Sequence, residues 1–77
     1  MIIIEQSKTY FVNFNNVCQM TLAVDEDEKE YAIIAKTVDK EELVMGIYST
    51  EEKAKEVLEK IYTFYGLGQK LVKMPEE

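Results

Sequence analysis

Apolar and polar residues alternate over much of the first 48 positions, which predicts β-strands. The clearest case is residues 17–24 (VCQMTLAV). One face of this predicted strand carries Cys18, Met20, Leu22 and Val24, and the other carries Gln19, Thr21 and Ala23. Alternation with a period of two is typical of a strand with one buried and one wet face. We expect further strands over residues 2–6, 9–14, 31–38 and 42–48.

Short polar segments separate the predicted strands. They are Ser7-Lys8, Asn15-Asn16, the acidic run 25–30 and Asp39-Lys40-Glu41. Asn and Asp favour turns because they tolerate left-handed backbone geometry. A parallel crossover needs about a dozen residues, so connections this short join neighbouring strands in antiparallel fashion. The sequence therefore predicts an antiparallel meander of four to five strands.

The stretch GIYSTEEKAKEVLEKIY, residues 46–62, predicts a helix that starts after Ser49 and ends near Gly66. Ser49 and Glu52 match a capping box, in which each side chain bonds the backbone amide of the other residue. Apolar residues then recur at spacings of three and four, namely Ala54, Val57, Leu58, Ile61, Tyr62 and Tyr65. Such a stripe predicts that one face of the helix is buried.

One helix and one sheet can bury their apolar sides only against each other. The predicted fold is therefore α+β, an antiparallel meander of four to five strands with one C-terminal helix packed on one face. We expect residues 1–77 to form a single small domain, with residues 69–77 as a last short strand or an extended tail. Gly46, inside a predicted strand, indicates a bulge or a close approach of the helix.

The net charge of −6 and the absence of arginine limit the classes of partner. Residues 25–30 (DEDEKE) carry −4 of this charge. Binding to nucleic acid depends on cationic side chains that neutralise phosphates, so we expect no nucleic-acid partner. No apolar run approaches the roughly 18 residues that cross a bilayer, so we expect no membrane partner either. A lone cysteine agrees with a reducing compartment, and we expect a cytoplasmic protein.

Residues suited to catalysis or metal binding are scarce. The chain has no histidine, the commonest general base and metal ligand. Cys18, in step with Met20 and Leu22, is expected to be a buried core cysteine. The acidic run 25–30 fits a calcium loop poorly, so we expect a solvated hairpin loop, with weak cation binding as the alternative. We therefore expect no enzyme activity, no cofactor and no metal site.

Five tyrosines and three phenylalanines are more aromatic residues than so small a core is expected to hide. Stacking on single-stranded nucleic acid would need basic neighbours, whereas the neighbours here are mostly neutral or acidic. Tyrosine is enriched at interfaces between proteins. Two alternatives stay open: an interaction surface with Tyr10, Phe11 and Tyr65 as its candidates, and ordinary core-edge positions with hydroxyl groups in water.

Two segments carry a resemblance to a known group of proteins. Residues 12–17 have the pattern V-N-F-x-N-V, and residues 46–58 have the pattern G-x-Y-x-[ST]-E-E-[KR]-A-K-E-V-L. With Met74-Pro75-Glu76 near the end, the chain resembles a family of short uncharacterised proteins from Firmicutes bacteria and their prophages. The resemblance implies a phage or mobile-element context and supplies no activity and no site residues.

These observations favour a non-enzymatic protein-interaction or structural module, with a protein partner or with itself as a homo-oligomer. The alternative is an acidic phage-encoded inhibitor that mimics nucleic acid, because the chain is strongly acidic. Mimicry needs carboxylates spread over a surface like phosphates. Most of the acidic excess lies in the single run 25–30, which argues against this alternative.

Overall fold

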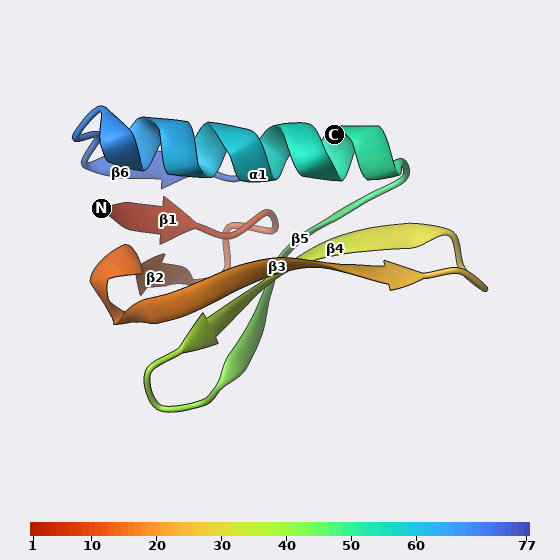
Figure 1. Ribbon diagram of the computed structural model, residues 1–77, viewed down its shortest axis with the longest axis horizontal. Coiled ribbons are helices and arrows are strands. Elements are labelled where there is room, and N and C mark those ends of the chain that lie inside the picture. The colour runs from red at the N-terminus through yellow and green to blue at the C-terminus, as the bar shows by residue number, and fades with distance from the viewer.

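Six strands and one α-helix make up the protein in a computed structural model that describes residues 1–77 (Figure 1). In chain order the elements are β1 (Ile2–Ile4), β2 (Phe11–Asn13), the 3-10 helix η1 (Phe14–Asn16), β3 (Val17–Asp25), β4 (Glu30–Thr37), β5 (Glu42–Tyr48), α1 (Glu51–Gly66) and β6 (Leu71–Lys73). The predicted α+β class, with α1 covering one face of a sheet, is confirmed. The strands form two three-stranded sheets, however, and not one meander.

The larger sheet is an antiparallel meander in the order β3-β4-β5. β3 pairs with β4 as far as the Asp25–Glu30 pair, so the acidic run lies at the hairpin turn between these strands. The opposite end of β4 leads through a second short turn into β5. Lys29 and Lys40 adopt positive φ angles of 54° and 69° in these two turns, which allows the chain to reverse within a few residues. This half of the fold follows the sequence prediction.

The smaller sheet has the order β2-β1-β6. Ile3 lies opposite Val12 of antiparallel β2 on one side and opposite Val72 of parallel β6 on the other. The sequence pattern does not predict a parallel pair, because the argument from short connections applies only to strands that follow each other along the chain. β1 and β6 come from the two ends of the chain, with the larger sheet and α1 between them in sequence. The segment 69–77 thus contributes a strand, which was one of the two expectations for it.

α1 starts one residue later than the capping-box pattern predicts. Its N-cap is Thr50, whose side-chain oxygen accepts a hydrogen bond from the amide of Lys53 at 3.1 Å. Ser49 is bound elsewhere, because its amide and its hydroxyl both donate to the carboxylate of Glu77. Ser49 and Thr50 could each cap the helix, but Ser49 is hydrogen-bonded to Glu77, so Thr50 is the cap. α1 has 16 residues, many of them charged, and could not span a membrane.

One core lies between α1 and the sheets. Its buried cluster consists of Ile3, Ile33, Ala35, Met45, Tyr48, Ala54, Val57, Ile61 and Met74. Three of these residues come from the predicted helix stripe. Tyr62 and Tyr65 also belong to that stripe, but their exposed fractions are 63% and 54%, so their inclusion was wrong. The stripe is narrower than the spacing suggested, because these tyrosines lie at its flanks.

A β-bulge at the start of β3 reverses the predicted orientation of Cys18. The register with β4 shifts between Val17 and Gln19, so one residue of β3 is extra at this point. An extra residue moves the side chains before it to the opposite face of the strand. Val17 is therefore partly buried and Cys18 is exposed. The prediction of a buried Cys18 is wrong because the alternation holds only beyond the bulge.

A second bulge lies in β5, as Gly46 predicts. Ile33 and Ile34 of β4 pair with Gly46 and Val44, which leaves Met45 as the extra residue. A Cβ atom on Gly46 would lie 2.8 Å from the hydroxyl oxygen of Tyr48. The close neighbour that requires glycine is therefore the tyrosine ring of the same strand, and not the helix.

The loop after β1 joins the two sheets along the free edge of β5. The backbone amide of Gln6 donates to the backbone carbonyl of Met45 at 2.8 Å, and the side-chain hydroxyl of Tyr10 donates to the backbone carbonyl of Val44. Unpaired backbone groups at a sheet edge are open to pairing with other chains. This loop occupies them and fixes the smaller sheet beside the larger one.

Candidate interaction surface

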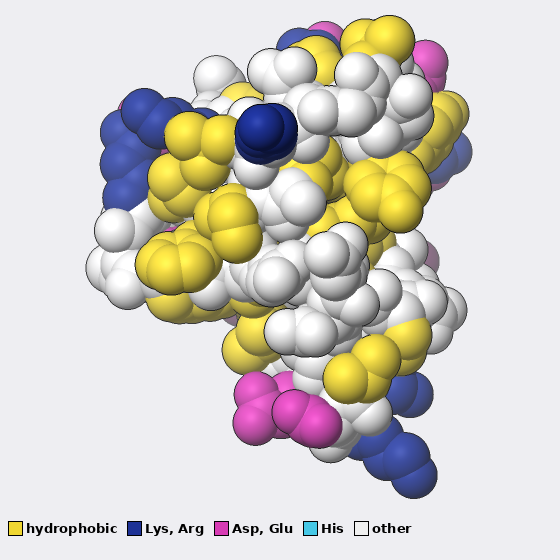
Figure 2. Space-filling model, turned by 90° about the vertical axis from the view of Figure 1, so that its left-hand side faces the viewer, with side chains coloured by type: hydrophobic (Ala, Val, Ile, Leu, Met, Phe, Trp, Pro, Cys, Tyr) yellow, Lys and Arg dark blue, Asp and Glu magenta, His cyan; other side chains and the backbone are white.

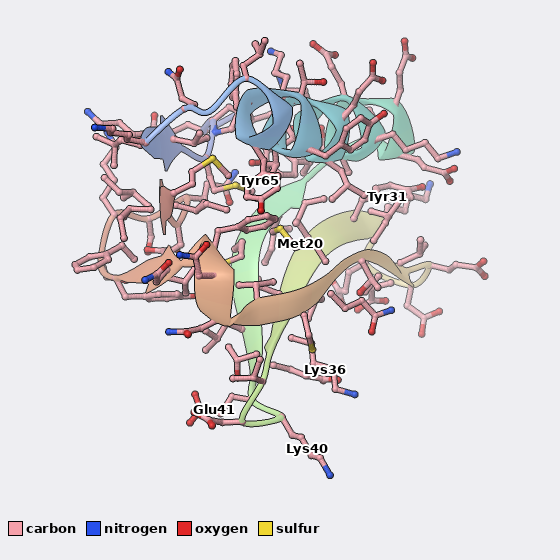
Figure 3. All side chains as sticks on the ribbon, turned by 60° about the vertical axis from the view of Figure 1, so that its left-hand side comes forward. Met20, Tyr31, Lys36, Lys40, Glu41 and Tyr65 are labelled. Carbon is pink, nitrogen blue, oxygen red and sulfur yellow. The ribbon has the colours of Figure 1, made fainter.

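The β3-β4-β5 sheet has an outer face, which we define as the side that points away from α1. Lys36 projects from this face, whereas Met20 and Tyr31 of the same sheet point toward the helix (Figure 3). The outer face consists of Gln19, Thr21, Ala23 and Asp25 from β3, Glu30, Ala32, Ile34 and Lys36 from β4, and Glu42, Val44 and Ile47 from β5. The two bulges set which residues belong to it.

The strand register arranges these side chains in four rows across the sheet. From one end to the other the rows are Gln19–Lys36–Glu42, Thr21–Ile34–Val44, Ala23–Ala32–Ile47 and Asp25–Glu30. Residues that lie opposite each other on one face of paired strands are in lateral contact, so each row is a continuous strip. The outer face therefore has two central rows that are mostly apolar and two polar end rows.

The central rows leave large apolar side chains in water. Val44 is 44% exposed and Ile47 is 42% exposed, and Ile34 between the strands is partly exposed. Single exposed apolar residues are common on protein surfaces, but contiguous apolar patches rimmed by polar residues mark interaction sites. The arrangement of these rows fits that second description.

The end rows differ in charge. One end carries Asp25 and Glu30, next to the acidic turn of the β3–β4 hairpin. The other end carries the cation of Lys36, with Gln19 and Glu42 beside it. Lys40 lies in the turn beyond this second end (Figure 3). The outer face is therefore anionic at one end and contains a cation at the other.

The sequence contains a signal for this face that the strand prediction did not use. Residues 31–36 (YAIIAK) are apolar at five consecutive positions, whereas a half-buried strand alternates. An unbroken apolar run is typical of a strand that is covered on both faces. In this chain α1 covers only one face of β4.

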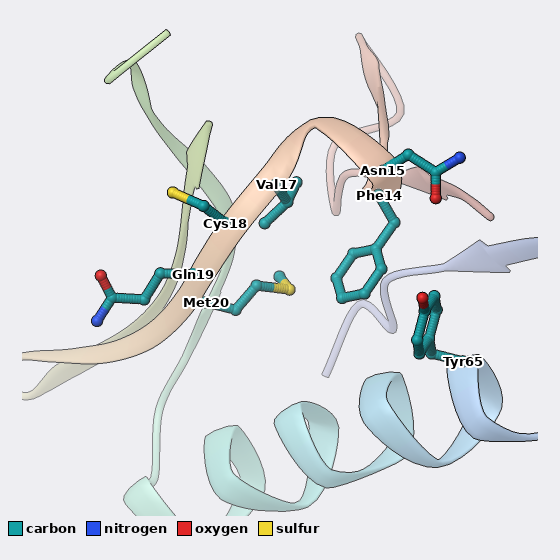
Figure 4. A pocket seen from close by; sticks show the side chains of 7 residues that line it. All are labelled: Phe14, Asn15, Val17, Cys18, Gln19, Met20 and Tyr65. Carbon is teal, nitrogen blue, oxygen red and sulfur yellow. The ribbon is translucent and has the colours of Figure 1, made fainter. Parts of the chain in front are cut away.

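A groove opens beside the start of β3, where the side chains of Phe14 and Tyr65 meet (Figure 4). Their ring centroids are 5.1 Å apart and the rings are tilted by 55°. The groove has a volume of about 440 Å³ and is lined by Phe14, Asn15, Val17, Cys18, Gln19, Met20 and Tyr65. Figure 4 shows that the sulfur of Cys18 points away from the helix side of the strand. The groove is open and its lining offers no charged group.

The three aromatic residues proposed from the sequence lie in different settings. Tyr65 stands on α1 against Phe14, and Tyr10 donates its hydroxyl to the backbone of Val44. Burial and the charge of Glu5 raise the pKa of Tyr10. Phe11, on β2, is 66% exposed. Figure 2 shows the side of the molecule that lies at the left in Figure 1. Hydrophobic side chains are exposed there in several groups, which polar atoms separate.

Glu5 is the one buried charged side chain among the core positions, with 5% exposure. Its carboxylate accepts hydrogen bonds from the amide and hydroxyl of Ser7 and from the amide and hydroxyl of Thr9. These donors, with the Ser7 hydroxyl first among them, lower the pKa of Glu5 from 4.5 to about 2, against the opposing effect of burial. All the hydrogen bonds to the carboxylate oxygens come from residues of the same turn. Glu5 therefore orders the loop that lies along the free edge of β5.

The acidic turn and Cys18 are both at the surface. Asp25 accepts from the amides of Asp27 and Glu28 at 3.1 and 3.2 Å, which is a local turn stabilisation. The thiol of Cys18 contacts the carbonyl of Lys36 at 3.4 Å. The structure contains no group of three or more side chains placed to hold a metal ion.

Comparisons of the chain with protein-family models, with curated proteins and with solved structures find no match.

Proposed function

We propose that this protein is a non-enzymatic interaction module whose binding surface is the outer face of the β3-β4-β5 sheet. The observation that supports the proposal is the pair of mostly apolar rows at the centre of that face. One row passes through Ile34 and the other through Ile47, and both are open to water. Burying apolar surface is the main driving force of protein association. A partner that covers these rows would gain this free energy.

The rigidity of the surface also supports the proposal. The central rows lie on three paired strands, and α1 holds the opposite face of the sheet. A surface that is ordered before binding loses little conformational entropy when a partner binds. The outer face is therefore a better binding platform than a mobile loop would be.

The rival hypothesis, an acidic inhibitor that mimics nucleic acid, has less support. Its carboxylates would have to follow a surface at the spacing of phosphates. The acidic excess is concentrated in the turn between β3 and β4, at one end of the sheet. We include in our proposal the bacterial and prophage context that the sequence resemblance implies, and a cytoplasmic location.

The proposal is tested with a double variant, Val44→Thr with Ile47→Thr. Threonine keeps the β-branched shape that strands favour, and its hydroxyl takes the place of a methyl group of Val44 and of the ethyl group of Ile47, so the fold should persist. The matched control is Val38→Thr, because Val38 is 62% exposed but lies in the turn after β4. Circular dichroism checks that all three proteins are folded.

Association is then measured by sedimentation velocity and by affinity capture from bacterial extracts. We expect the wild type and the Val38 variant to associate with themselves or with a reproducible partner, and we expect the double variant to lose that association. If the double variant retained every association of the wild type, the outer face would not be the binding surface. If the wild type associated with nothing, the interaction function would be wrong.

A further inference from the structure

We infer that the occupant of the outer face is a second copy of this chain, stacked face to face with its strands antiparallel to those of the first. This inference rests on the proposed function, because it names the partner of the same surface. It is carried by the order of the four rows: a row with Lys36 between Gln19 and Glu42, two mostly apolar rows, and a row with Asp25 and Glu30. That order is complementary to itself.

Charge selects one of two symmetric arrangements. Two identical sheets can stack through a two-fold axis that runs between them, either across the strands or along them. With the axis across the strands, each strand lies over its own counterpart in reverse direction, so Lys36 of one copy lies over Glu30 of the other. With the axis along the strands, Lys36 lies over Lys36 and Glu30 over Glu30. Opposite charges in register stabilise the first arrangement, and like charges oppose the second.

The apolar rows fit the same axis. When the axis passes midway between them, Ile34 of one copy lies over Ala32 of the other, and Val44 lies over Ile47. The large side chain of Ile34 opposite the small one of Ala32 allows these parts of the two layers to interdigitate, whereas Val44 and Ile47 make an apolar contact of two large side chains. Packed sheets lie about 10 Å apart with nearly aligned strands, which is compatible with this overlay. One symmetry operation thus pairs Lys36 with Glu30 of the other copy and also brings the two sets of apolar rows together.

The size of the face predicts a weak dimer. Three strands spaced about 4.8 Å apart, with four rows along them, give a face of roughly 15 by 20 Å. A standard interface buries about 800 Å² on each partner, which is more than this face supplies. We therefore expect dissociation constants in the micromolar to millimolar range, and the dimer should be sought in concentrated solution.

The test uses charge reversal at Lys36 and Glu30. The three variants are Lys36→Glu, Glu30→Lys and the double variant with both changes. The two positions are six residues apart on β4, roughly 20 Å at the rise of a strand, so within one chain their charges are largely screened from each other at physiological salt. Any recovery of association in the double variant must therefore come from contacts between two copies. Both side chains are at least partly exposed, so folding should be unaffected.

Sedimentation equilibrium at physiological salt measures the dissociation constant of each protein. We expect each single variant to weaken the dimer about tenfold, because two symmetric ion pairs become repulsive. Glu30→Lys should weaken it even though this change reduces the net negative charge, which by itself would favour association. We expect the double variant to return to near the wild-type value, because reversing both charges restores the pairs.

Two results would overturn the inference. One is a wild-type protein that stays monomeric at millimolar concentration. The other is a double variant that associates no better than the single variants. The interaction function itself would survive either result if the Val44→Thr, Ile47→Thr protein lost a captured partner that the wild type binds, so the two failures can be told apart.

Discussion

The side chain of Gln6 forms two hydrogen bonds with the backbone of Ile47. Its amide oxygen accepts from the Ile47 amide at 2.8 Å, and its amide nitrogen donates to the Ile47 carbonyl at 3.0 Å. An extended neighbouring residue would make the same pair of bonds in an antiparallel sheet. Gln6 therefore replaces a missing strand partner at the edge of β5, and it holds the smaller sheet against the larger one.

We expect Gln6→Ala to reduce the free energy of unfolding by about 1–2 kcal/mol, since each lost bond contributes about 0.5–1.5 kcal/mol and water partly replaces it. Urea unfolding followed by circular dichroism measures the change. Gln69→Ala is the matched control, because Gln69 is an exposed glutamine in the segment before β6. The Gln6 side-chain nitrogen also donates to the carbonyls of Pro75 and Glu76, both at 3.2 Å, so equal stabilities of the two variants would show that these bonds and the Gln6–Ile47 bonds together contribute nothing.

We expect Gly46→Ala to be destabilising by about 1–3 kcal/mol, the usual cost of overpacking a core. The added Cβ would lie 2.8 Å from the hydroxyl oxygen of Tyr48. Tyr48 is held in place, because it is only 1% exposed and its hydroxyl donates a hydrogen bond to the carbonyl of Pro75. Gly66→Ala is the control, because no atom lies within 4 Å of its Cβ position and it ends α1. That change should be stabilising by about 0.4–1 kcal/mol. Relative to the wild type, the thermal unfolding temperature should fall for Gly46→Ala and rise for Gly66→Ala.

Stability should depend on acid pH through Glu5. Its pKa in the folded protein, about 2, lies below the ordinary value of 4.5, so the folded state stabilises the ionised carboxylate relative to the unfolded state. This stabilisation is present above about pH 4.5 and is lost as the pH falls toward 2. We expect Glu5→Gln to be less stable than the wild type at neutral pH and to approach it at low pH.

Urea midpoints across this pH range test the prediction. Glu59→Gln, at an exposed helix position, is the control and should run parallel to the wild type. If the Glu5→Gln curve ran parallel to the wild type as well, the hydrogen bonds from Ser7 and Thr9 would not favour the charged carboxylate.

Adjacent residues of α1 should differ sharply in their tolerance of substitution. Ile61 is 2% exposed and Tyr62 is 63% exposed. We expect Ile61→Ala to cost about 2–5 kcal/mol through the lost packing and the cavity left behind. Tyr62→Ala should change stability by about 0.5 kcal/mol or less, which is typical of surface substitutions. Chemical unfolding of both variants decides the point, and similar losses would mean that the buried stripe includes Tyr62.

Local patterns predicted the elements whose contacts are close in sequence. The hairpin turns around residues 25–30 and 39–41 and the strands beside them form where the alternation places them. The helix stripe through Ala54, Val57 and Ile61 is buried as its spacing predicts. These elements depend on backbone periodicity and turn chemistry, which act over a few residues.

The candidate surface was predicted less well. Tyr10, Phe11 and Tyr65 were selected as surplus aromatic residues, and whether they bind a partner stays a prediction. The outer face, by contrast, is built from Ile34, Val44 and their neighbours, which the sequence pattern assigned to strands but to neither face of the sheet. Without knowledge of which face α1 covers, the consecutive apolar residues of β4 cannot be divided into core and surface.

The sequence by itself determined the α+β class, the β3-β4-β5 hairpins and the buried stripe of α1, because each is a periodic pattern along one segment. Only the tertiary structure decided that Cys18 faces water, that β6 pairs in parallel with β1, and that Thr50 caps the helix while Ser49 binds Glu77. Each of these depends on a partner far away along the chain or on one extra residue in a strand. A single-residue bulge shifts the alternation, so that the side chains on its two sides no longer follow one pattern, and distant pairings form only when a shared core brings the ends of the chain together.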